Sequence, residues 1–287
     1  MNNKGGTGKT TVSMIVAHDF ALRGKRVLAL DLDPQCNFSR RFLEMEIDPI
    51  DNNIIRPPKH SGIDPNDPTE EAFEPDEGED GTEHSANIFI HGGTLPYPTS
   101  HKNIHVIPGH SELLLSVERV TEQKLHSVVL HQVKDCFKDP YFSENYDVAV
   151  IDTGPSKGPL TSAALEAATD IIIPTKMEEM SVEGLIGMLA FWEKTNILRP
   201  ANKKVNLIGV LANMVKGTSG MHKHYFKSLS EEPNLGQYML TQILHDWQGY
   251  AEGLIKDAKP MLFNRRKDKC ATEAKELCDH IYSQMFT

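Results

Sequence analysis

The chain has 287 residues, and 39% of them are hydrophobic, which is enough apolar material for a large packed α/β domain. Its formal net charge is −10, yet ten of the 40 acids lie between Asp64 and Glu83, so the remaining charges balance and an anionic partner is not excluded. No apolar run approaches the roughly 20 residues of a membrane span, and the four cysteines form no CxxC pair. We expect a cytoplasmic protein with structural thiols and no membrane partner.

Helical periodicities and short apolar runs alternate along the chain. The first predicted helix spans Lys9 to Leu22, and Gly24 follows it as a stop signal. Buried strands are predicted at Val27–Leu30, Ile104–Ile107, Val148–Ile151, Ile171–Ile173 and Leu207–Leu211. Further helices are predicted at Glu112–Val120, Gly158–Ala168 and Ala271–Phe286. This alternation predicts an α/β fold with a mostly parallel twisted sheet and helices on both faces.

One segment breaks the alternation, at about residues 48–86. It combines clustered acids with repeated prolines and few apolar residues, so little burial offsets the entropy cost of ordering it. We expect a mobile acidic insertion within a single domain that spans residues 1–287. A solvated linker is the simpler interpretation, and a partner-binding role is the alternative.

A glycine-rich run immediately precedes the first helix. Glycines allow consecutive backbone N–H groups to turn toward a phosphate, and the helix N-terminus adds partial positive charge. The Lys9 ammonium can reach the β and γ phosphates, and the Thr10 hydroxyl can ligate Mg²⁺. The predicted nucleotide-binding residues here are Gly5, Gly6, Thr7, Gly8, Lys9, Thr10 and Thr11.

The run from Lys4 to Thr11 resembles the deviant Walker A pattern KGGxGKT of the ParA/MinD superfamily. This resemblance implies a P-loop NTPase fold, ATP and Mg²⁺ as cofactors, and an ATP-dependent homodimer in which Lys4 contacts the phosphates bound by the other subunit. A cation aimed at the γ-phosphate stabilises the transition state of phosphoryl transfer, so Lys4 and Lys9 are assigned catalytic roles. A solvated charge near the phosphates is the alternative for Lys4.

Two acids follow the second predicted element. Asp31-Leu32-Asp33-Pro34-Gln35 resembles the DxDPQ segment of the same superfamily. The resemblance implies that Asp33 positions or activates the attacking water as a catalytic residue and that Asp31 supports the magnesium shell. Carboxylates suit both roles, because Mg²⁺ prefers oxygen ligands and keeps waters that an acid can orient. A helix N-cap is the alternative for each.

A third acid ends a run of four hydrophobic residues. Val148 to Asp152 has the Walker B form, which implies that Asp152 reaches Mg²⁺ directly or through water. The superfamily commonly has Asp-x-Pro-Pro here, whereas this chain has Gly154 in place of the first proline. We expect the glycine to loosen this turn.

Two further positions resemble those that line the base pocket in the superfamily. Asn213 ends a predicted strand, and an amide that both donates and accepts suits the adenine edge. A strand-ending turn asparagine is the alternative. Pro260 lies in a segment whose resemblance to the base-pocket loop is weak.

The resemblance covers most of the chain from Lys4 to the last helix, and it is closest to the DNA-partitioning branch of ParA-type proteins. It implies a slow ATPase that acts as a dimerisation switch in plasmid or chromosome partitioning, with a ParB-like partner and location at the nucleoid. Non-specific double-stranded DNA would be bound through basic residues such as Arg265 and Arg266, or through a looser cluster of Lys216, Lys223 and Lys227. Solvated surface charge is the alternative for both clusters. The alternative function is a MinD-like, nucleotide-gated adaptor that positions a protein machine without binding DNA.

Only three residues precede Lys4. The superfamily usually carries about ten further residues there, which form the strand that leads into the loop. We therefore expect the first strand to be missing from this chain and the natural start to lie upstream of Met1.

Overall fold

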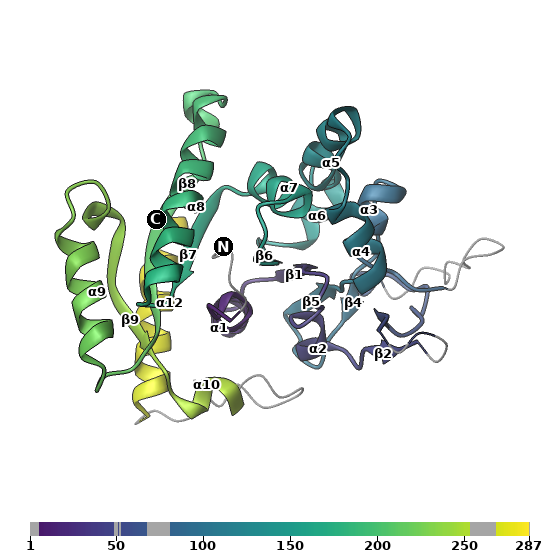
Figure 1. The fold of residues 1–287 in the computed structure, drawn as a ribbon. Coiled ribbons are helices and arrows are strands. Elements are labelled where there is room, and N and C mark those ends of the chain that lie inside the picture. Colours follow the sequence, from purple (N-terminus) through teal and green to yellow (C-terminus); the bar gives the residue numbers. More distant parts are fainter. Residues whose placement is uncertain (1–5, 49–50, 52, 68–80, 253–267, 287) are drawn as a thin grey trace. The chain divides into compact units, whose positions relative to one another are not determined.

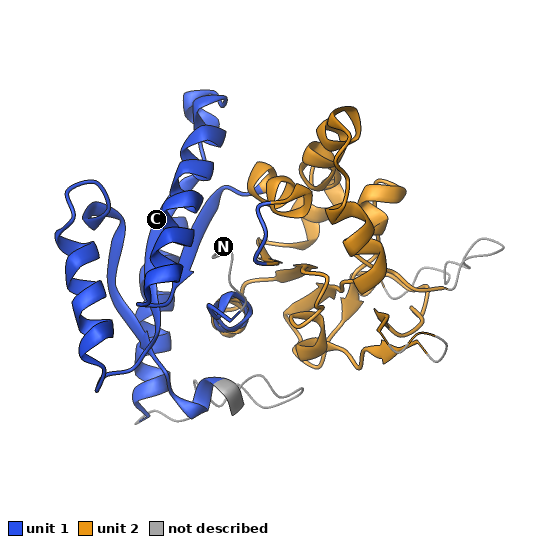
Figure 2. Cartoon of the chain, viewed as in Figure 1, with its two compact units in different colours: residues 1–15, 155–157, 168–287 blue, residues 16–154, 158–167 orange. Residues whose placement is uncertain are grey.

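The computed structural model describes residues 6–48, 51, 53–67, 81–252 and 268–286. These residues form two compact units (Figure 2). The first unit contains residues 1–15, 155–157 and 168–287, and the second contains residues 16–154 and 158–167. Helix α1 (Lys9–Leu22) begins in the first unit and ends in the second.

In its described residues the first unit is built on a parallel sheet with the strand order β7-β8-β9. Side chains from α8 and α9 pack with those of β7 and β8 in one buried cluster, while α12 packs on β9 from the opposite face (Figure 1). The elements are β7 (Asp170–Thr175), α8 (Glu179–Ile197), η1 (Ala201–Lys203), β8 (Asn206–Val215), α9 (Gly220–Glu231), η2 (Gly236–Tyr238), β9 (Met239–His245), α10 (Gln248–Glu252) and α12 (Lys269–Phe286).

The main sheet of the second unit has the order β4-β5-β1-β6. Strand β1 runs parallel to both β5 and β6, whereas β4 is an antiparallel edge. The elements after α1 are β1 (Val27–Leu32), α2 (Ser39–Phe42), β2 (Glu46–Ile47), β3 (Ile55–Arg56), α3 (Asn87–Ile90), β4 (Tyr97–Pro98), β5 (Ile104–Ile107), α4 (Ser111–Glu118), α5 (Gln123–Cys136), α6 (Pro140–Asn145), β6 (Val148–Thr153) and α7 (Pro159–Ala167).

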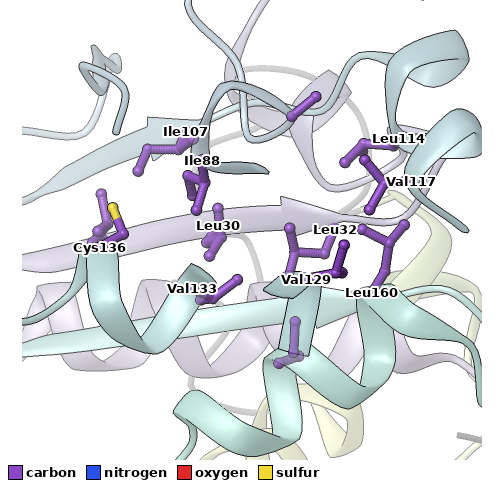
Figure 3. Close-up of a cluster of buried hydrophobic side chains, with 14 of the residues drawn as sticks. Leu30, Leu32, Ile88, Ile107, Leu114, Val117, Val129, Val133, Cys136 and Leu160 are labelled. Carbon is purple, nitrogen blue, oxygen red and sulfur yellow. The ribbon is translucent and has the colours of Figure 1, made fainter. Parts of the chain in front are cut away.

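The core of the second unit lies between β1 and the helices on one face of the sheet. Alternate residues of a strand point to the same face, so Leu28, Leu30 and Leu32 all enter one cluster. Figure 3 shows Leu30 and Leu32 among side chains from α3, α4, α5 and α7, which include Ile88, Leu114, Val129, Val133 and Leu160. Burial of each large side chain contributes roughly 1.5–3 kcal/mol. This packing fixes strand β1, which carries Asp31 and ends one residue before Asp33.

The alternation of strands and helices confirms the predicted α/β fold. The predicted helix Lys9–Leu22 and the predicted strand Ile104–Ile107 have the observed bounds. Gly24 has φ +84°, and the N–H of Lys25 donates to the carbonyl of Phe20 at 3.0 Å, a helix-ending pattern that confirms the predicted stop. The parallel strands are divided between the two units, and the single-domain expectation stays a prediction.

Some described parts of the segment predicted to be a mobile insertion, at about 48–86, contact the rest of the second unit, and its mobility stays a prediction. His84, Ser85 and Ala86 are buried, and the Ser85 hydroxyl donates to the Asp31 carbonyl at 2.6 Å. Earlier in the segment, the Asn66 amide donates to the hydroxyl of Tyr146 at 3.0 Å. These hydrogen bonds attach parts of the segment to the rest of the second unit, although its apolar residues are few. Residues 68–80 lie outside the described residues.

Candidate functional site

Residues 6–8 of the glycine-rich run form a loop that leads directly into α1. Gly6 has φ +87° and Gly8 has φ +81°, which are backbone angles that residues with a β-carbon reach only at a cost. The N–H of Val12 donates to the Gly8 carbonyl at 3.0 Å, so the helix starts at once after Gly8. Lys9 is the first residue of α1, and Thr10 and Thr11 lie half-buried in its first turn. These backbone angles at Gly6 and Gly8 are compatible with an anion nest, and the role of the loop in phosphate binding stays a prediction.

Asn213 of β8 supports this loop from the same unit. Its side-chain amide is buried and donates to the Thr7 carbonyl at 2.7 Å. A β-carbon on Gly8 would lie 2.2 Å from the Asn213 Nδ2 atom, so glycine is required at Gly8 for space as well as for conformation. The side-chain oxygen of Asn213 accepts from the N–H of Met214 at 3.0 Å.

Asn213 does not end its strand, which corrects the sequence-based boundary. Strand β8 continues to Val215, because Val215 still pairs with His245 of β9. The turn-asparagine alternative therefore does not apply. The role of Asn213 at the adenine edge stays a prediction, and its observed contact is with the phosphate loop.

The second unit carries two acids on neighbouring strands. Asp31 of β1 and Asp152 of β6 are cross-strand partners in the parallel register, and their residues are 0% and 1% exposed. Burial, followed by the charge of Asp152, raises the pKa of Asp31 to about 7. Strand β1 extends two residues beyond the predicted Leu30, so Asp31 lies within it rather than at its end. Two adjacent buried carboxylates repel each other and lower the stability of the fold, unless one of them is protonated or a cation binds both.

Hydrogen bonds hold the Asp31 carboxylate in place. One oxygen accepts from the N–H of Asp33 at 3.0 Å, and the other accepts from the N–H and the hydroxyl of Ser39 at 2.8 and 2.6 Å. Ser39 is the first residue of α2, so Asp31 binds the start of this four-residue helix, whereas the residue at its N-cap position is Phe38. Asp31 thereby fixes the loop that contains Asp33.

Asp33 lies in a constrained turn at the carboxyl end of β1. Its Oδ1 atom accepts from the N–H of Gln35 at 3.0 Å, and a β-carbon on Gly154 would lie 3.4 Å from the same oxygen. Cys36, three residues on, has φ +52°, a strained value for a residue with a side chain. Gly154 therefore allows the end of β6 to lie close to the Asp33 carboxylate. The sequence alone predicted only that this glycine would loosen the turn.

The residue types fit a nucleotide and a divalent cation. A loop that excludes side chains at Gly6 and Gly8 exposes backbone N–H groups to phosphate oxygens, and the carboxylate pair Asp31 and Asp152 offers the oxygen ligands that Mg²⁺ prefers. Within the described ranges, no group of three or more His, Cys, Asp or Glu side chains could hold a metal ion. A magnesium ion held by Asp31 and Asp152 would therefore need further oxygen ligands from outside this pair.

A family profile described as an AAA domain matches residues 1–207, which is more than half of the chain. The protein belongs to this AAA-domain family. The order of its motifs, from the deviant phosphate loop to Asp152, makes it a member of the ParA/MinD type.

Named relatives of this AAA-domain protein include two bacterial proteins. A Rhizobium rhizogenes protein named as a replication protein A is 29% identical over 291 residues, which cover 96% of this chain and 64% of that protein. The chromosome-partitioning ATPase Soj of Thermus thermophilus is 28% identical over 216 residues, which cover 75% of this chain and 68% of Soj. The chain thus spans about two thirds of the length of these relatives.

Solved structures share the fold at low sequence identity. An ATP complex of a Cyanothece McdA variant has a TM-score of 0.69 at 17% identity and covers 98% of this chain and 94% of that chain. This similarity concerns the fold alone.

Several residues that the sequence analysis assigned to binding or catalysis lie outside the described residues. They are Lys4, Gly5, Pro260, Arg265 and Arg266. Their assigned roles stay predictions.

The three lysines of the looser basic cluster lie at the surface, but the neighbouring His222 does not. Lys216, Lys223 and Lys227 are exposed, and Lys227 lies 3.8 Å from Glu231 in an ion pair of α9. His222 is buried, and its Nδ1 atom accepts from the N–H of Lys216 at 3.0 Å. His222 therefore holds the β8–α9 turn and does not face a partner. None of the helices in the described residues is long and apolar enough to cross a bilayer.

Sequence reasoning missed two residues at the site, Ser39 and Lys176. Ser39 binds Asp31 from eight residues downstream, a spacing that no motif indicates. Lys176 follows β7 directly, and its Nζ atom lies 3.8 Å from the position of a β-carbon on Gly6. Ligand sites in parallel sheets lie at the carboxyl ends of the strands. The position of Lys176 shortly after a predicted strand could therefore have indicated that it lies near a ligand site.

Proposed function

We propose that this protein is an ATP- and Mg²⁺-dependent partitioning ATPase, whose nucleotide state controls dimerisation and the binding of non-specific double-stranded DNA. The observation that carries the proposal is the phosphate loop, in which Gly6 and Gly8 adopt positive φ directly before α1 and Asn213 holds the loop backbone. In that conformation backbone N–H groups can bind a polyphosphate without a side chain at Gly6 or Gly8.

Each site residue has a role in this proposal. Backbone N–H groups from Gly5 to Thr11 bind the phosphates, Lys9 neutralises their charge, and Thr10, Asp31 and Asp152 serve the magnesium ion. Asp33 orients the attacking water. Its fixed turn supports that role, because a carboxylate held in one direction needs little reorganisation during the reaction.

Partitioning is supported by the names of the relatives. Soj of Thermus thermophilus is named as a chromosome-partitioning ATPase and aligns with three quarters of this chain. In the proposal, Lys4 contacts the nucleotide of the partner subunit in the ATP-bound homodimer, a ParB-like protein stimulates hydrolysis, and Arg265 and Arg266 contact DNA phosphates at the nucleoid.

Fluorescence anisotropy of a labelled duplex of arbitrary sequence tests the DNA step, while light scattering follows the dimer. We expect binding and dimerisation with ATP and Mg²⁺, neither with ADP, and a steep loss of affinity between roughly 50 and 200 mM salt. The Arg265→Ala/Arg266→Ala variant should still dimerise but should no longer bind DNA. Dimerisation of the unaltered protein without DNA binding in any nucleotide state would refute partitioning and support the adaptor alternative.

A further inference from the structure

Lys176 occupies a position beside the phosphate loop that no motif assigns. It follows β7, belongs to the first unit like the loop itself, and is half-buried. Its Nζ atom lies 3.8 Å from where a β-carbon on Gly6 would stand. Because Gly6 has no side chain, the ammonium group approaches the loop where its backbone is bare.

The loop beside Lys176 leads directly into the N-terminus of α1. The N-terminus of α1 carries partial positive charge, and Lys9 lies in its first turn. Across the described ranges, no carboxylate forms an ion pair with Lys176 and no hydrogen bond to its side chain is present. An ammonium group held beside a helix N-terminus and near a second lysine favours the binding of an anion there.

We propose that Lys176 is a third lysine of the phosphate site and binds the polyphosphate of a nucleoside triphosphate together with Lys9 and the loop N–H groups. This inference rests on the proposed function, because it assumes that the loop binds a nucleotide. The long flexible stem of lysine allows the ammonium to move from its present place beside Gly6 to a phosphate oxygen. The bound anion then offsets the cost of holding the cation at the loop.

A purely structural role makes a different prediction. If Lys176 only supported the loop, its removal would lower the stability of the nucleotide-free protein. A ligand-binding role predicts unchanged or raised stability without nucleotide, since removal relieves repulsion, together with a smaller stabilisation by ATP.

The experiment compares unaltered protein, Lys176→Gln, Lys176→Arg and Lys204→Gln. Lys204 is an exposed lysine of the same unit and serves as the matched control. Calorimetric titration with ATP and Mg²⁺ at two salt concentrations gives affinities, and thermal melting without nucleotide gives stability. We expect Lys176→Gln to weaken ATP binding by roughly ten- to a hundredfold, with a shallower salt dependence and an unchanged or higher Tm. Lys176→Arg should recover most of the affinity, and Lys204→Gln should match the unaltered protein.

ATP affinity of Lys176→Gln equal to that of the unaltered protein would overturn the inference. So would a lower Tm without nucleotide accompanied by a loss of affinity that Lys176→Arg does not recover, because that pattern indicates loop support alone. Absence of ATP binding by the unaltered protein would instead refute the proposed function, so the two failures are distinguishable.

Discussion

Asp31 and Asp152 are cross-strand partners on β1 and β6, and both residues are buried. The parallel register brings together two acids that are 121 positions apart in the chain. Burial, followed by the charge of Asp152, raises the pKa of Asp31 to about 7. A cation bound by both acids would offset the repulsion between their charges.

Replacement of Asp152 by Asn should separate stability from activity. Removing one charge of the pair relieves repulsion, so we expect the Tm of metal-free protein to rise by a few degrees, which corresponds to about 1 kcal/mol. We expect Mg²⁺-dependent ATP turnover to fall by at least about a hundredfold, since a catalytic metal is worth several kcal/mol. Asp135→Asn, which removes an exposed partner of Lys138, is the control and should change neither. A lower Tm together with retained turnover would contradict the metal role of the pair.

Gly8→Ala tests the phosphate loop against a matched glycine. Gly8 and Gly24 have nearly equal φ values of +81° and +84°, but a β-carbon on Gly24 meets nothing within 4 Å. Gly24→Ala should therefore cost only the backbone strain, about 1–2 kcal/mol by chemical denaturation. Gly8→Ala adds a clash with the Asn213 amide and should also abolish ATP binding. Equal effects of the two substitutions on stability and on ATP affinity would show that the close approach to Asn213 is unimportant.

Asn213→Ala should loosen the loop through its lost hydrogen bond. The Thr7 carbonyl would be left without its buried donor, at a cost of about 1–3 kcal/mol in stability, and we expect ATP affinity to fall by roughly tenfold or more. Asn206→Ala on the same strand is the control, because its side chain binds Asp170 at the exposed end of β8. Denaturation and calorimetry on both variants provide the measurement. ATP affinity of Asn213→Ala equal to that of Asn206→Ala would exclude a supporting role for Asn213.

Acid sensitivity of the second unit should depend on His105. Burial lowers the pKa of His105 below its ordinary value, against the opposing charge of Asp64, while Nδ1 contacts the Tyr146 hydroxyl at 2.9 Å. The unfolded chain then binds a proton at higher pH than the folded chain, so stability falls as pH decreases through about 6.5, by at most about 1.4 kcal/mol per pH unit for this group.

The measurement for His105 is the urea midpoint between pH 7.5 and 5.5. His105→Gln should show a shallower decline than the unaltered protein, whereas His91→Gln, at an exposed position, should keep the original slope. Parallel declines in all three proteins would assign the acid sensitivity to other groups.

Sequence patterns correctly predicted the helices and strands whose ends are determined by neighbouring residues in the chain. Helix α1 starts after a glycine loop and stops at Gly24, so its bounds could be predicted from adjacent residues. Strand β9 was missed because its polar Thr241 and Gln242 interrupt the apolar run, and its pairing with β8 stabilises it instead. Helix α8 was missed because Gly184 and Gly187 lie within it.

Long-range contacts at the site were beyond sequence reasoning. The partner of Thr7 is Asn213, which is 206 residues away, and only the packing of β8 beside the loop brings them together. The resemblance assigned Asn213 to a base and Asp31 to a metal shell, while the structure adds that each also holds a loop in place. The positions of the glycine-rich loop, Asp33 and Asp152 could be predicted because each lies in a contiguous motif, and their roles stay predictions.

The most direct test of the account is calorimetric titration of the protein with ATP in the presence of Mg²⁺, beside the variant Lys9→Ala. The account predicts saturable binding near one ATP per chain for the unaltered protein and a loss of binding for the variant, while both melt at similar temperatures. No detectable binding to correctly folded protein, or equal affinity of the two proteins, would contradict the claim that residues 4–11 form a nucleotide phosphate site.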